Sequence, residues 1–474
     1  MTPVSEAVVV GVTSHGADVR GNVMRWTASS VIFETPATGA ALCLSEAIED
    51  FRVLQQEKTL YSGRVVVRSV IDTGPTHVCE AGLNAAWIDE EASSSEGEID
   101  VKTSFRQLIQ HWQDSYEISP EFKAVVVDLQ SFMSDLRMWL DRIEMRVLSA
   151  PEKDRARLAR KVLEETGPVA AQSIDSLVEK FELLAERLPD EQRPAHRKLL
   201  RRLLHPLVLC APFAYRSYYK PLGYAGDYGM VNMILGDPYQ GETFFAKVIN
   251  AWLLRQAPAA AHRNRLATLL QKLCEETVRV STSGRPARIY SLGCGPAGEV
   301  QQFLAEKDFS DQARFTLVDF SEETLRFTRE VIERIQTKHH RRASVEVVKK
   351  SVSHILKESL VSAKTPGGMQ YDFVYCAGLF DYLTDPICRR LMNIFYNWLA
   401  PGGLLMVTNV DATLNDSRAF RHSMDYILDW NLIYRTSARL RTLAPDDVSP
   451  GDCVITAEDS GVNAFLEVRK PLHE

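Results

Sequence analysis

The first 88 residues carry short apolar runs that are rich in β-branched residues and separated by turn residues. The runs read "AVVVGV", "SSVIFET", "RVVVRSVID" and "THVCEAGL". Such runs are typical of strands, so we predict a small β domain over residues 1–88. Residues 89–100, "DEEASSSEGEID", are acidic, rich in serine and nearly free of large apolar side chains. We interpret this segment as a linker.

Residues 101–280 change to a helical period. Apolar residues recur three and four positions apart within residues 105–112, 129–143 and 174–184, which indicates amphipathic helices. The basic stretch "RPAHRKLLRRLLHP" carries leucine pairs at helical spacing. We therefore interpret it as a solvated helix face in preference to a phosphate-binding patch. Two more helices are expected on either side of a break near Pro258.

From about residue 285 strands and helices alternate, and we assign residues 281–474 to a separate α/β domain. The strand candidates read "ARIYSLGCG", "RFTLVDFS", "SVEVVKKSV", "YDFVYCAGLFDYL", "LAPGGLLMVTNV" and "NAFLEVRK". Helical segments separate the first five. This order predicts a doubly wound, mostly parallel sheet.

Composition and charge narrow the class of protein. A net charge of −7 over 474 residues gives no reason to expect nucleic-acid binding, which usually requires a basic face. No apolar run is long enough to cross a membrane, and the N-terminus lacks the features of a signal peptide. The eight cysteines form no C-x-x-C pair, which argues against a zinc site and a disulfide framework. We expect a cytoplasmic protein without a metal site.

The segment "SLGCGPAGE" places a G-x-G-x-x-G turn between a strand and a helix. Glycines let the backbone approach a ligand, and the helix N-terminus offers free N–H groups. Both dinucleotide and S-adenosylmethionine (SAM) proteins use this turn, and a plain strand-to-helix turn is a third reading. The candidate cofactor-binding residues here are Gly293, Cys294, Gly295, Pro296, Gly298 and Glu299.

Asp319 ends the second strand, where a carboxylate can accept hydrogen bonds from both ribose hydroxyls. Its neighbours Phe320 and Ser321 join the candidate cofactor site. As the N-cap of the next helix, Ser321 fits better than Asp319. The turn "LAPGG" and a closing hairpin with an antiparallel last strand are typical of class I methyltransferases, and favour SAM over a nicotinamide dinucleotide.

Longer motifs extend this picture: "KPLGYAGDYGMV", "HRNR", "SLGCGPAGE", "YDFVYCAGLFDYL", "MDYILDWNLIYR" and "GVNAFLEV". Over roughly residues 200–474 the sequence resembles a bacterial family of class I SAM-dependent methyltransferases linked to biosynthesis of 3-hydroxypalmitic acid methyl ester, a diffusible signal. The resemblance implies a Rossmann-like domain, SAM as cofactor and a small, lipid-like acceptor. The sequence departs from common methyltransferase patterns at Ser291 and after the third strand, where an acidic residue is often found.

The resemblance also implies site residues outside the glycine turn. The loop "YKPLGYAGDYG", within the range 211–241, would act as a lid in which Tyr224 or Asp227 orients the acceptor; packing of tyrosines against the helices is the alternative. Val352 would lie near the adenine. After the fourth strand, small residues would form the wall beside the methyl group, and Asp381 and Tyr382 would touch the acceptor. The small wall residues are Cys376, Ala377 and Gly378.

The sequence favours a carboxylate as the methyl acceptor. A carboxylate is ionised at neutral pH, whereas a hydroxyl needs a base, and no clear His–Asp pair occurs in the motifs. Arg421 or Arg435 could pair with that carboxylate; ion pairs with Asp425 or Asp429 are the alternative.

The N-terminal segment "VRGNVMRWTASSVIFET" resembles the core of a PilZ domain, a small β barrel that holds cyclic di-GMP. Here Arg25, Thr27 and Ser30 stand where that family has Asp, Ser and Gly, so cyclic di-GMP binding is not expected. Two functions remain open. The chain is either an active small-molecule O-methyltransferase, or a regulatory protein that uses the fold for ligand or partner binding without turnover.

Overall fold

The computed structural model describes most of the chain. The described residues are 7–14, 16–27, 30–36, 42–55, 58–72, 76–83, 102, 106, 109, 118–362, 370–412, 420–449 and 452–472. The predicted linker at 89–100 and most of the predicted helix at 105–112 lie outside them.

The N-terminal part is a closed barrel with strand order β1-β2-β3-β6-β5-β4. Its core is built from alternate residues such as Val9, Phe33 and Val65, which are fully buried. The predicted β domain is therefore confirmed, and it closes on itself. The strands are β1 (Ala7–Val12), β2 (Asp18–Trp26), β3 (Ser30–Pro36), β4 (Ala47–Gln55), β5 (Lys58–Asp72) and β6 (Thr76–Leu83).

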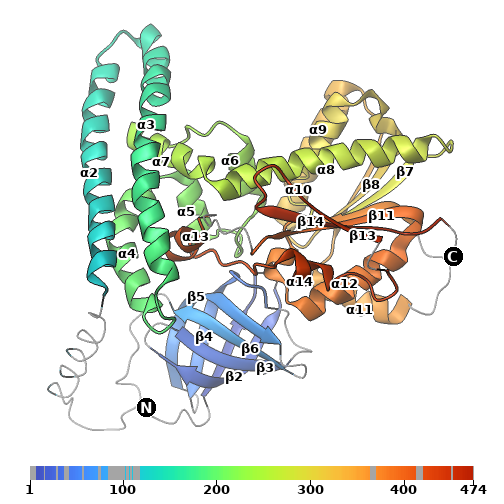
Figure 1. Cartoon of the computed structure of the whole chain (residues 1–474), viewed down its shortest axis with the longest axis horizontal. Coiled ribbons are helices and arrows are strands. Elements are labelled where there is room, and N and C mark those ends of the chain that lie inside the picture. Colours follow the sequence, from blue (N-terminus) through green and yellow to red (C-terminus); the bar gives the residue numbers. More distant parts are fainter. Residues whose placement is uncertain are drawn as a thin grey trace.

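The central region is helical, as predicted. Its helices are α2 (Pro120–Leu148), α3 (Glu152–Glu186), α4 (Arg193–Val208), α5 (Pro212–Tyr219), α6 (Tyr228–Leu235), α7 (Phe244–Arg255) and α8 (Ala257–Ser281). Helices α2 and α3 form a long antiparallel pair along one side of the molecule (Figure 1). The range 211–241 differs from the expected loop: α5 and α6 occupy most of it, and only residues 220–227 between them are irregular.

The basic stretch at 193–206 is helical, but two of its arginines are not on a solvated face. Arg197 donates to Asp425 at 2.6 Å, and Arg201 donates to Asp429 at 2.9 Å. Both carboxylates belong to a helix and its C-cap in the C-terminal part of the chain. The prediction of a solvated face is wrong here because α4 packs against a distant segment.

The C-terminal part is a seven-stranded sheet with order β13-β14-β11-β10-β7-β8-β9. Strands β7 to β11 are parallel, and β14 is inserted antiparallel between β11 and β13. The predicted doubly wound sheet and its inserted last strand are confirmed. The strands are β7 (Ala287–Leu292), β8 (Ala313–Asp319), β9 (Ser344–Lys349), β10 (Tyr371–Cys376), β11 (Leu399–Val410), β13 (Cys453–Ala457) and β14 (Asn463–Arg469).

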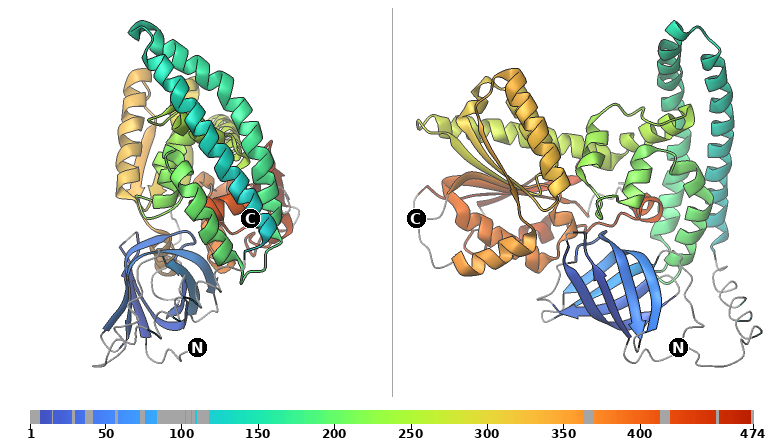
Figure 2. Two further views of the ribbon diagram at one scale, coloured as in Figure 1. Left: turned by 90° about the vertical axis from the view of Figure 1, so that its left-hand side faces the viewer. Right: turned by 180° about the vertical axis from the view of Figure 1, so that it is seen from behind.

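Helices cover both faces of this sheet (Figure 2). They include α9 (Gly298–Glu306), α10 (Glu322–His339), α11 (Val352–Ser362), α12 (Asp385–Trp398) and the short α14 (Ser437–Arg441), with 3-10 turns at Asp308–Gln312 and Phe380–Tyr382. Helix α13 (Arg421–Leu428) instead packs against α3, α4 and α5 of the helical region. The barrel lies beneath the sheet domain and the base of the helical region (Figures 1 and 2). Within the described residues, no helix has the length and apolar content needed to cross a membrane.

Candidate active site

A cavity of about 280 Å³ lies at the carboxyl ends of the parallel strands. Ligands of open α/β sheets bind outside these ends. Residues that follow β7, β8, β9 and β10 line it from the sheet. Side chains of α8, of residues 224–234 and of residues 424–434 line it from the other sides.

The glycine turn has the backbone shape that its sequence predicts. Gly293 and Gly295 have φ values of +67° and +51°, in the left-handed region that favours glycine. Gly298 begins α9, and a Cβ there would lie only 2.7 Å from Leu266 Cδ1. Glycine at this position lets α9 pack closely against α8. The six residues predicted in this turn, Gly293, Cys294, Gly295, Pro296, Gly298 and Glu299, all line the cavity.

Asp319 holds the turn and faces the cavity. Its Oδ2 accepts from the Gly295 amide at 3.1 Å, and its Oδ1 accepts from the Ser321 amide at 3.0 Å. Burial raises the pKa of this carboxyl, and the backbone donors oppose the rise. Ser321 itself does not line the cavity; its Oγ accepts from the Thr324 amide and caps α10.

A second group of lining residues lies beyond Asp319. Phe320 and Val352 line the cavity, together with Ser351 and Lys350. Glu299 also lines the cavity, and its Oε1 accepts from the Tyr375 hydroxyl at 2.7 Å. Burial raises the pKa of Glu299.

The segment after β10 supplies a wall of small residues. Ala377 and Gly378 line the cavity, whereas Cys376 lies in the apolar core behind it and does not. Gly378 has φ +91°, and its amide donates to Thr408 Oγ1 at 2.8 Å. The predicted wall is thus formed by two of the three residues.

The segment 219–229, which we call the tyrosine loop, reaches the cavity through Tyr224 and Tyr228. The Tyr224 ring lies 4.9 Å from the Phe320 ring, and its hydroxyl is 3.2 Å from Thr324 Oγ1. The hydroxyl therefore lies beside the start of α10. Burial raises the pKa of Tyr224. Tyr228 donates to Glu323 Oε1 on the same helix at 2.9 Å.

Asp227, predicted to orient an acceptor, does not line the cavity. Its Oδ1 accepts from the Arg216 Nε at 2.7 Å and from the Met230 amide at 3.0 Å. It is the N-cap of α6, so its contacts hold the end of the loop in place.

Asp381 and Tyr382 face the cavity from the turn after β10. Trp430 Nε1 donates to the Tyr382 hydroxyl at 2.8 Å. Asp381 Oδ1 accepts from the Val410 amide at 2.8 Å. Burial raises the pKa of Asp381 to about 6, opposed by the Arg265 charge.

Arg265 of α8 is a cavity residue that we did not predict. It is half-buried, and its Nη2 donates to His262 Nδ1 at 2.7 Å. A Cβ on Gly378 would lie 3.0 Å from its Nη1, so the guanidinium lies over the wall of small residues. No carboxylate of the described residues forms an ion pair with it, and burial lowers the pKa of both Arg265 and His262. The only signal in the sequence is its place in the "HRNR" motif.

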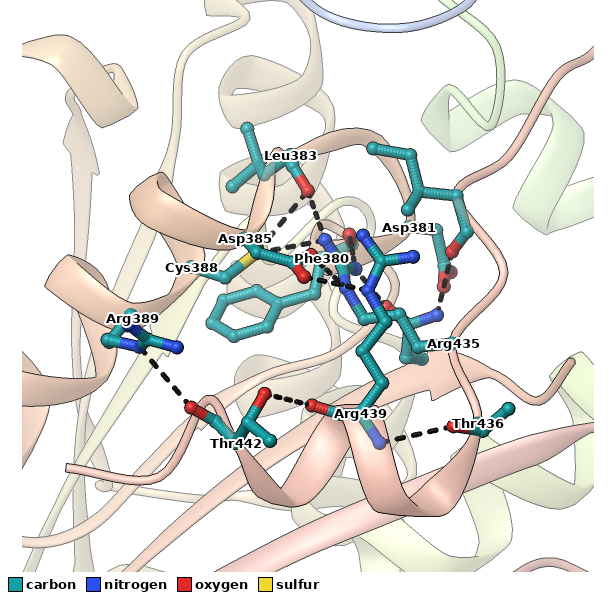
Figure 3. Close-up of polar contacts among 12 residues, drawn as sticks. Phe380, Asp381, Leu383, Asp385, Cys388, Arg389, Arg435, Thr436, Arg439 and Thr442 are labelled. Carbon is teal, nitrogen blue, oxygen red and sulfur yellow. Dashed lines mark hydrogen bonds and ion pairs between the residues drawn. The ribbon is translucent and has the colours of Figure 1, made fainter. Parts of the chain in front are cut away.

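Arg421 and Arg435 do not face the cavity. Arg435 is fully buried, donating to Asp385 Oδ1 at 2.8 Å and to the Phe380 carbonyl at 2.7 Å (Figure 3). The Arg421 guanidinium lies 4.8 Å from the centre of the Tyr434 ring. Neither arginine is placed to bind an acceptor carboxylate.

The suggested ion pairs of these two arginines are also wrong for the described residues. Asp425 and Asp429 pair instead with Arg197 and Arg201 of α4. Nor does the described part of the chain contain a group of three or more His, Cys, Asp or Glu side chains that could hold a metal ion.

Residues 290–405 match the family model described as a methyltransferase domain. This part of the chain is a methyltransferase domain. The match spans the glycine turn, Asp319 and the wall after β10, the residues that the geometry brings to one cavity. A comparison with curated proteins finds no match.

Solved structures that are similar to the chain include a possible exported protein from Bordetella parapertussis, with 16% identity, TM-score 0.38, and coverage of 75% of this chain and 99% of that one. Magnesium protoporphyrin IX methyltransferase from Synechocystis has 13% identity and TM-score 0.31, and the match covers 45% of this chain and 84% of that one. The N-methyltransferase NodS from Bradyrhizobium japonicum has 14% identity and TM-score 0.27, and the match covers 45% of this chain and 97% of that one. TM-scores this low carry no functional information beyond the family match.

Proposed function

We propose that the chain is a SAM-dependent methyltransferase that acts on a small, lipid-like acceptor. One observation carries the proposal: a buried carboxylate and a half-buried guanidinium, which forms no ion pair with a carboxylate of the described residues, line the same cavity. Asp319 is held beside Gly295, and Arg265 lies over Gly378. This pair suits a ligand with ribose hydroxyls at one end and an amino-acid carboxylate at the other.

The residues fit SAM as follows. Asp319 would accept hydrogen bonds from the ribose hydroxyls, while Phe320 and Val352 would flank the adenine. Arg265 would bind the amino-acid carboxylate with charge-assisted hydrogen bonds. Bound SAM supplies a methyl group on a positively charged sulfur, so the chain has mainly to align the acceptor for an in-line displacement. Ala377 and Gly378 leave room for that approach.

We further propose a carboxylic acid, such as a 3-hydroxy fatty acid, as the acceptor and a methyl ester as the product. The apolar side chains of Met424 and Leu432 in the cavity lining support a lipid-like body. A carboxylate acceptor needs no base. A hydroxyl acceptor would require one, and Asp381, which lines the cavity, would then take its proton.

The decisive assay uses SAM labelled in its methyl group with two probes. 3-Hydroxypalmitic acid offers a carboxylate and a hydroxyl, and its methyl ester offers the hydroxyl alone. We expect label in the acid only, with the product mass of the methyl ester. Asp381→Asn should leave this transfer nearly unchanged, because the amide still accepts from Val410.

Other outcomes would contradict the proposed acceptor group or the proposed activity. Label in the ester probe, lost in Asp381→Asn, would make the chain a hydroxyl methyltransferase. Binding of S-adenosylhomocysteine (SAH) without transfer to either probe or to a lipid extract would favour the sensor function. The eight free thiols support a reducing, cytoplasmic location as part of the proposal.

A further inference from the structure

The barrel docks directly on the tyrosine loop and on the segment that follows α13. The Ala47 amide donates to the Gly223 carbonyl at 2.7 Å. Ser45 Oγ donates to the Asn431 carbonyl at 2.9 Å, and it accepts from the Asn431 amide at 2.5 Å. Ser14 also presses against Gly223, where a Cβ would lie 2.3 Å from that of Ser14. The barrel therefore contacts both the tyrosine loop and the segment after α13 through neighbouring residues of the barrel.

This contact brings barrel residues into the lining of the cavity. Ser14, Cys43 and Leu44 line it together with Glu46. The buried Glu46 carboxylate fixes this group, because its Oε1 accepts from the Ser14 amide at 3.1 Å and its Oε2 accepts from the Cys43 amide at 3.1 Å. Ser45 has φ +60°, a left-handed conformation that is held by its bonds to Asn431. These barrel residues thus form one wall of the cavity, the barrel wall, whose backbone is fixed by hydrogen bonds.

The barrel wall adjoins a segment whose cavity residues are not among the cofactor candidates. Asn431, bonded to Ser45, stands between Trp430 and Leu432, which both line the cavity. Trp430 contacts Tyr382. The cofactor candidates lie elsewhere, on the glycine turn and after β8 and β9. Leu44 precedes Ser45 in the chain and lines the same cavity, so it lies near the segment that carries Trp430 and Leu432.

We propose that Leu44 of the barrel contacts the apolar body of the acceptor, so that the barrel forms part of the acceptor site and helps to select the substrate. This inference rests on the proposed function. It assigns Leu44 as a specificity-determining residue and Glu46 as a positioning residue that holds Ser14 and Cys43.

The test uses the full-length protein and cis-parinaric acid, an apolar carboxylic acid whose fluorescence rises on binding. Leu44→Asp places a charge in the wall, and Leu44→Met keeps its apolar character. Val12→Asp is the matched control, because Val12 lies on the same barrel and is 45% exposed. We expect Leu44→Asp to raise the Kd of the probe at least about tenfold, and the other two variants to change it by less than about twofold.

SAH affinity, measured by calorimetry, should change by less than about twofold in all three variants. A loss of SAH affinity in Leu44→Asp with probe binding kept would place Leu44 against the cofactor and overturn the inference. Unchanged probe binding in that variant, or no probe binding to the unmodified chain, would also overturn it. If Leu44→Asp fails to fold, Leu44→Ala is judged by the same criteria. Absence of methyl transfer in the unmodified chain would refute the proposed function, whereas probe binding tests the barrel separately.

Discussion

Asp319→Asn tests the cofactor assignment most directly. The substitution keeps the shape of the side chain and an oxygen that can accept from the Gly295 or Ser321 amide. It removes the negative charge that would accept hydrogen bonds from ribose hydroxyls. Hydrogen bonds to charged groups contribute about 1.5–3 kcal/mol, so the Kd for SAH should rise by about tenfold to a hundredfold. Calorimetry at fixed ionic strength measures this change.

Ser321→Ala is the matched control for Asp319→Asn. Ser321 caps α10 but does not line the cavity, so its loss should lower stability by about 1 kcal/mol and leave the SAH Kd unchanged. NAD should not bind to any of these proteins. Two results would refute the reasoning: SAH affinity that survives Asp319→Asn, or binding of NAD in place of SAH. Because burial raises the pKa of Asp319, SAH affinity of the unmodified chain should also weaken as the pH falls.

Three further predictions concern the loop and its base. Tyr224→Phe keeps the ring against Phe320 and removes a hydroxyl that lies beside Thr324, so it should lower stability by about 1 kcal/mol and leave the SAH Kd and turnover at saturating SAM unchanged, as unfolding measurements, calorimetry and initial rates would report. Gly226→Val should lower both turnover and Tm, because Gly226 has φ +78° and a Cβ would lie 3.2 Å from the Tyr382 hydroxyl. Burial lowers the pKa of Lys220 from 10.5 to about 7. Between pH 7 and pH 10.5 the Lys220 amine is protonated in the unfolded state and mainly neutral in the folded state. The Lys220 side chain therefore makes the free energy of unfolding rise with pH over this range. Lys220→Met should remove that rise in unfolding measurements at pH 7, 8.5 and 10.

The sheet could be predicted because its strands contain apolar runs, which are most fully buried in β10 and β11. The six strand candidates correspond to β7 to β11 and β14. In the barrel, β2 and β4 carried a weaker signal. β2 alternates buried and exposed residues, and its exposed positions are largely charged or polar. β4 includes two adjacent exposed acidic residues, Glu49 and Asp50, which interrupt the period.

The candidate site was predictable only where it is local in sequence. The glycine turn and Asp319 lie on consecutive strand ends, so their meeting follows from the fold. Arg265 has no such signal, because an arginine on an amphipathic helix usually lies on the solvated face. Only the packing of α8 over the segment after β10 brings it to the cavity. Leu44 and Ser14 come from turns of a different domain, and no pattern along the chain indicates that contact.

The tyrosine loop is held on two sides, and this limits how it can act as a lid. On one side the hydroxyls of Tyr224 and Tyr228 contact residues of α10. On the other side the barrel bonds to its backbone: Ala47 donates to the Gly223 carbonyl, and Arg64 donates to the Tyr219 carbonyl at 2.9 Å. Movement of the loop alone would break both sets of contacts and leave backbone groups without partners, which is costly. An opening that keeps the barrel contacts moves the loop and the barrel together. Admission of the acceptor and its selection by Leu44 would then depend on the same docked surface.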